Sequence, residues 1–343
     1  MVLYVTNISV MRINNRRNIK NLIIMKIKLY LFSALLAAMP FLSSGCSNKN
    51  VSVENTDFES LNGYIDSDAG IIKRNLSLKN FHGIDANGVV EVYYTQGSKY
   101  KVEYEGRRGD FNKLKFYVKD GTLFVKDTSK KRTYSYDDEK CKLYITAPSI
   151  TELTNLGSFV FYADKMNTDR MTIDNTGSMS IKVNSLKTGA YKMSSRGSIS
   201  IAGKCNVESF DMDNSGACSC DVSLNVSGDV NVDNSGASKY NGSIVARNVN
   251  WNGRGADNCM ANIKANTIEF IESGAGKVSG KFKGDNISVS CSGASKMDID
   301  VNCNRVTANA SGNGNIKLSG MADHADVGTS GIAKIDTSRL NDF

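Results

Sequence analysis

Proline and histidine are nearly absent from this chain, which has two residues of each among 343. Proline cannot donate to a strand ladder, so having only Pro40 and Pro148 leaves room for long runs of strand. The two histidines, His82 and His324, are far apart and no two cysteines have the C-x2-C spacing, which argues against a zinc site. A P-loop, a dinucleotide fingerprint and a nucleophile elbow are also missing. We therefore predict no catalytic residue, no metal site and no cofactor.

Acidic residues are missing from the first 45 positions, and this explains the overall charge. The formal net charge is +7, and six of the 42 basic residues lie in 1–45. The rest of the chain is therefore close to neutral, at about +1. A neutral body has no electrostatic footprint for nucleic acid, so we expect no nucleic-acid partner.

The N-terminal segment has the pattern of an export signal. Two lysines precede an apolar run over 29–42, which is too short to span a bilayer comfortably. The run leads into Leu-Ser-Ser-Gly-Cys, which resembles the lipobox of bacterial lipoproteins and makes Cys46 the acylated residue. We predict a lipoprotein signal peptide over 1–45, with Met25 as a possible true start, and a polar tether over 46–75. Ordinary signal cleavage with Cys46 unmodified is the alternative. The expected location is the cell envelope, in the outer membrane, on its surface or its periplasmic side.

A short motif with a central glycine recurs ten times from residue 155 onward. The spacing between successive glycines is always 19 or 20 residues. The glycines are Gly157, Gly177, Gly197, Gly216, Gly236, Gly255, Gly274, Gly293, Gly312 and Gly331. Helical repeats and propeller blades need longer units of about 33 residues or more, so this period predicts one coil of a β-solenoid.

Apolar residues occupy fixed positions on both sides of each glycine. Four positions after it stand Phe161, Ile181, Ile201, Cys220, Tyr240, Cys259, Val278, Met297, Ile316 and Ile335. Four positions before it stand Leu153, Ile173, Met193, Met212, Val232, Trp251, Phe270, Val289, Ala308 and Val327. Polar residues alternate with them, which is the period of a strand. We predict an all-β fold: a right-handed parallel β-helix of about ten coils over 151–343, with glycine at a corner and an interior ladder of Asn155, Asn175, Asn214 and Asn234.

Residues 76–150 precede the repeat and are predicted to form an N-terminal β cap and the first coils. The strand pattern over 87–106 turns at Gln96-Gly97, and Asp120-Gly121 lies between two alternating segments, which is the signal of a hairpin. The C-terminal coil has no obvious cap. An uncovered strand edge can recruit another chain, so we expect possible homo-oligomers through this open rung.

Three segments resemble a known bacterial family. They are NFHGIDANGVVEVYYTQGSKYKVEYEG at 80–106, DGTLFVKD at 120–127 and CKLYITAPSITELTNLGS at 141–158. Together with the glycine corners, they are similar to the head domain called GIN, described as an autotransporter adhesin head. The resemblance covers roughly residues 76–340. It implies a β-helical domain, an exported location and a non-enzymatic role.

Eight cysteines are present: Cys46, Cys141, Cys205, Cys218, Cys220, Cys259, Cys291 and Cys303. Cys220 and Cys259 share an interior column but lie two coils apart, too far for a disulfide. Cys218 and Cys220 lie about 7 Å apart along one strand, which is also poor disulfide geometry. We expect most of the seven cysteines after Cys46 to be reduced and to fill the core.

Two outward columns carry charge. Asp174, Asp213 and Asp233 stand three positions before a glycine, and the last two are on adjacent coils about 5 Å apart. This pair could be a glycosidase-like pair or a weak calcium site, and a solvated polar face is the alternative. A basic column stands three positions after the glycine: Lys239, Lys277, Lys296 and Lys334. It could bind acidic glycans or anionic surfaces, or serve only solubility. Tyr240, Trp251 and Phe270 fall in core columns and are not expected to be sugar platforms.

Three functions follow from these features. The first is a lipid-anchored, adhesin-like module that binds a glycan or a protein. The second is a structural protein of the periplasm that self-assembles through its open end. The third is a carbohydrate-active enzyme that uses the aspartate column. The sequence favours the first.

Overall fold

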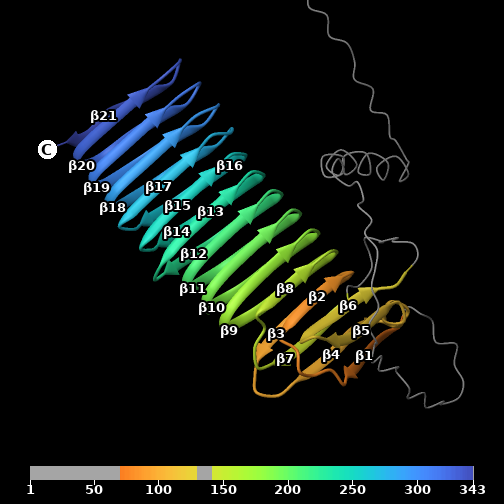
Figure 1. Ribbon diagram of the computed structural model, residues 1–343. Coiled ribbons are helices and arrows are strands. Elements are labelled where there is room, and N and C mark those ends of the chain that lie inside the picture. The colour runs from red at the N-terminus through yellow and green to blue at the C-terminus, as the bar shows by residue number, and fades with distance from the viewer. Residues whose placement is uncertain (1–69, 130–140, 343) are drawn as a thin grey trace, which may run out of the picture. The chain divides into compact units, whose positions relative to one another are not determined.

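The structure is a computed structural model that describes residues 70–129 and 141–342. The predicted signal peptide, Cys46 and the tether as far as residue 69 lie outside these residues. Within the described ranges, no helix has the length and apolarity needed to cross a membrane. The described chain is nearly all strand and is arranged as a β-solenoid of about ten turns, as the glycine repeat predicts (Figure 1).

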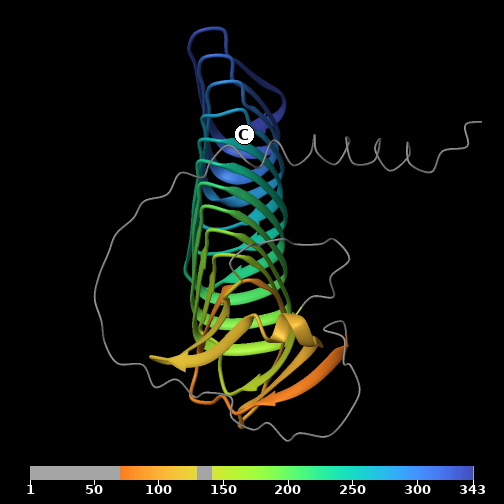
Figure 2. The same ribbon diagram turned by 90° about the vertical axis from the view of Figure 1, so that its right-hand side faces the viewer.

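The solenoid proper is built from strands that pair in parallel with the strand one coil away (Figures 1 and 2). Its strands are β9 (Ser158–Asn175), β10 (Ser178–Ser195), β11 (Ser198–Asn214), β12 (Ala217–Val226), β13 (Asp229–Asn234), β14 (Ala237–Val245), β15 (Asn248–Gly253), β16 (Ala256–Lys264), β17 (Thr267–Glu272), β18 (Lys277–Cys291), β19 (Lys296–Ala310), β20 (Asn315–Thr329) and β21 (Lys334–Asp342). The register places equivalent residues of successive coils beside each other, so each position of the repeat becomes a column.

Each coil contains three runs of inward side chains. The first run follows the glycine corner, the second is short, and the third leads to the next glycine. In β10 the buried residues are, run by run, Met179, Ile181 and Val183, then Leu186 and Thr188, then Tyr191, Met193 and Ser195. The predicted apolar columns are confirmed as interior over most of their length, and Trp251 stacks on Phe270 of the next coil with ring centroids 5.1 Å apart.

The glycine corners are tight, as predicted. A Cβ placed on Gly197 would lie 2.0 Å from the carbonyl oxygen of Gly177, and one on Gly236 would lie 1.9 Å from that of Gly216. Such distances leave no room for a side chain. The backbone of one corner therefore packs directly on the corner of the coil before it.

The predicted asparagine ladder exists inside these corners. Asn155 Nδ2 donates to Asn175 Oδ1 over 2.8 Å, and Asn214 Nδ2 donates to Asn234 Oδ1 over 2.6 Å. Ser195 extends the first pair, accepting from Asn175 Nδ2 at 3.1 Å. All five side chains are buried, so these hydrogen bonds satisfy most of their polar atoms where water cannot reach them; Asn214 Oδ1 is the exception and has no partner among the described residues.

The N-terminal region combines coil strands with antiparallel strands. Its elements are β1 (Ile71–Leu76), β2 (Gly83–Asn87), β3 (Val89–Gln96), β4 (Lys101–Arg107), α2 (Arg108–Phe111), β5 (Leu114–Lys119), β6 (Thr122–Asp127), β7 (Cys141–Ala147) and β8 (Glu152–Asn155). β2 and β3 pair in parallel with β8 and β9 and so begin the stack of coils. β5 and β6 form the predicted hairpin, in which Asp120 and Gly121 both have positive φ.

Two details of this region are not given by the sequence pattern. The strands on either side of the turn at Gln96-Gly97 do not pair with each other. Instead β7 lies between them, parallel to β3 and antiparallel to β4. Residues 71–75, which the sequence pattern assigned to the tether, lie in β1, which pairs antiparallel with β4. Both details arise from long-range pairing, which local alternation does not encode.

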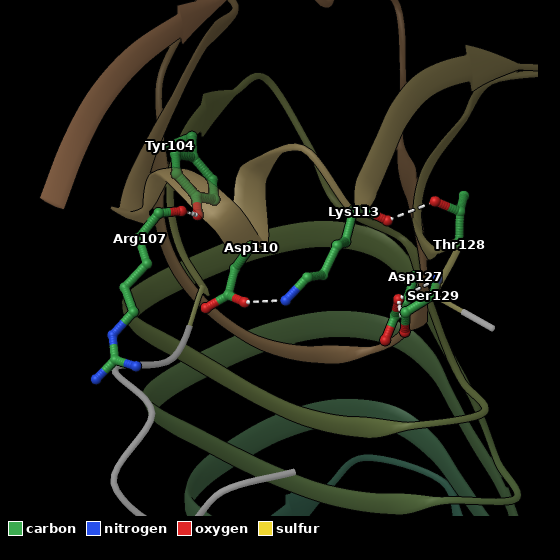
Figure 3. A network of polar contacts seen from close by, with 7 residues as sticks. All are labelled: Tyr104, Arg107, Asp110, Lys113, Asp127, Thr128 and Ser129. Carbon is green, nitrogen blue, oxygen red and sulfur yellow. Dashed lines mark hydrogen bonds and ion pairs between the residues drawn. The ribbon is translucent and has the colours of Figure 1, made fainter. Parts of the chain in front are cut away.

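Aromatic side chains close the N-terminal end of the core, and Figure 3 shows the polar contacts made beside them by Tyr104 and Lys113. The ring of Tyr104 packs edge-on against Phe111 and Phe116, with centroids 4.9 and 5.9 Å away. The Tyr104 hydroxyl donates to the carbonyl of Arg107 over 2.8 Å, which ties β4 to the start of α2. An ion pair between Lys113 and Asp110, at 3.3 Å, holds the segment that leads into β5. The core at this end is therefore covered.

The C-terminal edge is less covered. β21 pairs with β20 only as far as Ala322, so residues 323–329 of β20 lie on an edge. Val327 is 52% exposed, although its column is buried in earlier coils, and Ile332, which stands in an outward column, is 74% exposed. In the described part of the chain, this stretch of β20 therefore has no strand paired on its outer side.

Candidate functional site

The lysine stripe consists of Lys239, Lys277, Lys296 and Lys334 on the outer side of the first run. The register places Lys277 beside Lys296 on adjacent coils. Asn258 separates Lys239 from Lys277, and Asn315 separates Lys296 from Lys334. The four lysines therefore lie in one column along the solenoid, as the repeat predicts, and all four side chains are exposed. Adjacent rungs lie about 4.8 Å apart.

The stripe is not neutralised by the protein's own acids. None of its four lysines forms an ion pair with any residue that the structure describes. The nearby acids pair with other bases: Asp300 with Lys281 at 3.9 Å, and Asp298 with Arg339 at 3.7 Å. Like charges one rung apart repel each other, and an anion laid across them would relieve that repulsion.

A second feature lies on the same outer face, nearer the N-terminus. Tyr144 of β7, Tyr93 of β3 and Tyr162 of β9 are in register and form the tyrosine row. Their ring centroids are 5.2 and 5.0 Å apart, and the planes are within 20° of parallel. Lys182 of β10 continues the row, with Nζ 5.5 Å from the centroid of Tyr162.

The tyrosine row is built to present edges and hydroxyl groups. Because the rings stack on one another, their faces are occupied within the row, and Lys182 covers the outer face of Tyr162. The Tyr93 hydroxyl donates to Glu91 over 3.1 Å, and burial together with Glu91 raises the pKa of Tyr93 to about 12. A sugar that stacks on a free ring face is therefore a poorer fit than a ligand that accepts hydrogen bonds from the row.

Sequence reasoning missed the tyrosine row. Each tyrosine does stand at an outward position of an alternating strand, and that signal was available. Their contact depends on β7 lying beside β3, which places Tyr144 next to Tyr93. Spacing along the chain gives no hint of that neighbour.

The aspartate column is exposed, and Asp213 and Asp233 are adjacent as predicted. Asp233 accepts from Asn252 Nδ2 and from Arg254, both at 3.0 Å. Other outward acids are held in the same way: Asn231 donates to Asp211 over 2.8 Å, and Asn184 to Asp164 over 2.8 Å. These side chains form rung-to-rung ladders on the outside of the solenoid, which favours the structural reading of the column over a catalytic pair.

The seven cysteines that the structure describes are all buried and free, which agrees with their predicted role as core residues. Cys220, Tyr240 and Cys259 follow one another in an interior column. The Sγ atoms of Cys218 and Cys220 come within 3.4 Å, closer than the spacing along the strand suggests. Burial raises the pKa of Cys205 to about 12 and that of Cys303 to about 11, so both thiols are held in the protonated form.

Comparison with known proteins agrees with the resemblance seen in the sequence. The family described as "Putative auto-transporter adhesin, head GIN domain" matches residues 80–248 and 243–342. No curated protein matches the chain.

Solved structures from Bacteroides and Parabacteroides species are similar over most of this chain. A "putative adhesin" from Bacteroides fragilis has 19% identity and a TM-score of 0.35, covering 78% of this chain and 96% of that one. A "putative lipid binding protein" from Parabacteroides distasonis gives the same values. A "putative adhesin" from Parabacteroides distasonis has 14% identity and a TM-score of 0.40, covering 78% and 98%.

Proposed function

This chain belongs to the family of head GIN domains, and we propose that it is an exported, lipid-anchored, non-catalytic module that binds acidic glycans along its lysine stripe. The observation that carries the proposal is the run of lysines in register, with Lys277 beside Lys296 and no ion-pair partner among the described residues. The adhesin description of the family supports a binding role. The sequence pattern before Cys46 supports the lipid anchor.

The lipid anchor and the exposure of the solenoid on the cell surface can be tested separately. Acylation of Cys46 predicts that the protein partitions into the detergent phase of a cell extract and that Cys46→Ser moves it to the aqueous phase. Protease treatment of intact cells, with lysed cells as control, then tests whether the solenoid faces outward. Protection until lysis contradicts adhesion.

An extended acidic polymer fits the stripe better than a compact ligand. The stripe runs in one line across the coils from β14 to β21. Successive lysines of the stripe are one or two coils apart. A linear chain with regularly spaced carboxylates or sulfates can meet several of them at once. Such binding weakens as salt rises, because the charges are exposed and screened.

The decisive variant reverses charge at the adjacent pair, Lys277→Glu with Lys296→Glu. We expect at least a tenfold loss of affinity for a polyuronate or sulfated glycan, measured by titration at low salt. The matched control is Lys264→Glu with Lys283→Glu, an exposed pair that is also in register on adjacent coils but lies outside the stripe. Equal loss in both variants points to net charge alone, and unchanged binding in the first removes the stripe as the site.

A second candidate function is self-assembly through the open rung. It is favoured by the edge at residues 323–329 of β20 and by the exposure of Val327 and Ile332. The opposite end is covered by β1, β4 and the aromatic cluster around Tyr104. Two copies would then meet end to end at their C-terminal rungs and close as a dimer. Light scattering tests this: a monomer at high concentration counts against it, and Ile332→Lys should dissociate any dimer.

A further inference from the structure

The buried asparagine ladder ends at one defined place. Its last member, Asn234, donates through Nδ2 to Asp257 Oδ1, and Ser238 donates to the same oxygen. The next position of the ladder column is Gly253, which has no side chain to continue it. Asp257, from the other side of the corner, fills the space that the glycine leaves.

The following position of the column is Glu272, in register with Gly253. Both carboxyl groups point to the same spot. A Cβ on Gly253 would lie 2.2 Å from Glu272 Oε2 and 2.3 Å from Asp257 Oδ2. A Cβ on Gly276 would lie 2.3 Å from the carboxyl carbon of Glu272. The two glycines thus form the cavity that holds the acid pair.

This pair is buried without a compensating cation. Glu272 is 0% exposed and Asp257 3% exposed. Asp257 Oδ2 and both carboxyl oxygens of Glu272 have no hydrogen-bond partner. No lysine, arginine or histidine among the described residues forms an ion pair with either acid. The other titratable groups beside them are the Cys259 thiol on β16 and the Cys291 thiol on β18, the column neighbour of Glu272.

Two unpaired carboxylates cannot share a dry interior, because each would have to be desolvated and each would repel the other. We propose that Glu272 and Asp257 form an internal proton-binding site, in which protonated Glu272 donates to Asp257 Oδ2 and release of the proton loosens the coils that meet there. Asp257 is the acceptor because it already receives two hydrogen bonds, from Asn234 and Ser238, which favour its charged form. Glu272 accepts no hydrogen bond of this kind from a neighbouring amide or hydroxyl side chain, so it holds the proton.

The direction of the electrostatics supports this assignment. Burial, followed by the adjacent Asp257 carboxylate, raises the pKa of Glu272 from 4.5 to about 8. Burial also raises the pKa of Asp257, while its hydrogen bonds oppose that rise. The folded state therefore binds a proton that the unfolded chain releases above pH 4.5. The stability that this proton contributes is fully present below pH 4.5 and is lost as the pH rises toward about 8. Over that interval the equilibrium constant for unfolding increases by up to about tenfold per pH unit.

The only tryptophan of the chain reports on this site. Trp251 lies two residues before Gly253 and is buried against Phe270, two residues before Glu272. Its fluorescence therefore follows the opening of these coils, even if other coils unfold separately. Urea unfolding of the purified full chain, followed by tryptophan emission at pH 5 to 9, measures the proposed linkage.

We expect the urea midpoint of the wild-type chain to fall between pH 5 and 8 and to level off above that. Glu272→Gln keeps the shape of the side chain and donates a hydrogen bond at every pH, so its midpoint should stay level over that range. The matched control is Glu269→Gln, three residues earlier on β17 and exposed, which should keep the wild-type slope.

Three results would overturn the proposal. They are a level wild-type profile, a wild-type slope in Glu272→Gln, or loss of the slope in Glu269→Gln. If Glu272→Gln does not fold, Asp257→Asn provides the same test, because removing the neighbouring charge should narrow the pH window. Added CaCl2 tests the alternative that the pair binds a cation. If calcium raises the urea midpoint of the wild-type chain at pH 8.5 but not that of Glu272→Gln, the site binds a metal ion and the proton proposal is wrong.

Discussion

The early and late coils of the solenoid have the same corner glycine for different physical reasons. In the early coils the reason is space: at Gly197 a Cβ would lie 2.0 Å from a backbone oxygen of the preceding coil. In the late coils it is backbone conformation. Gly312 and Gly331 have φ of 62° and 72°, while the nearest atom to their Cβ positions is 3.4–3.5 Å away. Gly293 has both properties.

The interior of the corner changes over the same stretch. Early corners enclose the amide ladder from Asn155 to Asn234. After the acid pair, the column holds Cys291 and Ala310, which do not continue the amide hydrogen bonds. The comparison shows that the amide ladder is not what defines a coil. The apolar columns and the corner glycine persist where the ladder does not, so they set the fold, and the ladder stabilises part of it.

Substituting alanine for a corner glycine in an early coil and in a late coil should best separate the effect of limited space from the effect of positive φ. Gly197→Ala forces a methyl group into the backbone of the neighbouring coil, and we expect it to destabilise the solenoid by about 3 kcal/mol or more. Gly312→Ala adds a methyl group that has room but places alanine in the left-handed region, at a cost of about 1–2 kcal/mol. Urea midpoints followed by far-ultraviolet circular dichroism measure both. Equal costs would mean that one mechanism governs all corners.

Much of this comparison could be predicted from the sequence. The spacing of ten glycines gave the period, and the residues four positions on either side gave the interior columns. The asparagine ladder, the exposed aspartates and the lysine stripe all follow from the same register. These features are predictable because a solenoid makes each repeat position a column, so a local pattern becomes a contact between coils.

What could not be predicted depends on contacts outside a single column. Tyr144 meets Tyr93 because β7 is inserted beside β3, and that pairing joins segments about fifty residues apart. Glu272 and Asp257 belong to columns on opposite sides of the corner, and they meet only because Gly253 and Gly276 leave the space. The sequence did show one sign of this site, because Glu272 is an acidic residue in a column of small and amide side chains. Its partner was not evident.

The amide ladder itself offers the smaller and finer test of the comparison. Asn214→Ala removes the donor to Asn234 Oδ1 and leaves that buried oxygen without its partner. We expect a cost of about 1–3 kcal/mol, because an unsatisfied buried polar group loses its hydration and gains nothing in return. Cys291→Ala, in the same column of the late coils, removes a small side chain and its weak Sγ hydrogen bond to the Ser295 carbonyl, and it should cost about 1 kcal/mol or less. Urea midpoints of the two variants give the comparison. If both lose the same amount, the hydrogen bonds of the ladder contribute nothing beyond packing, and the early and late corners differ only in how their glycines are used.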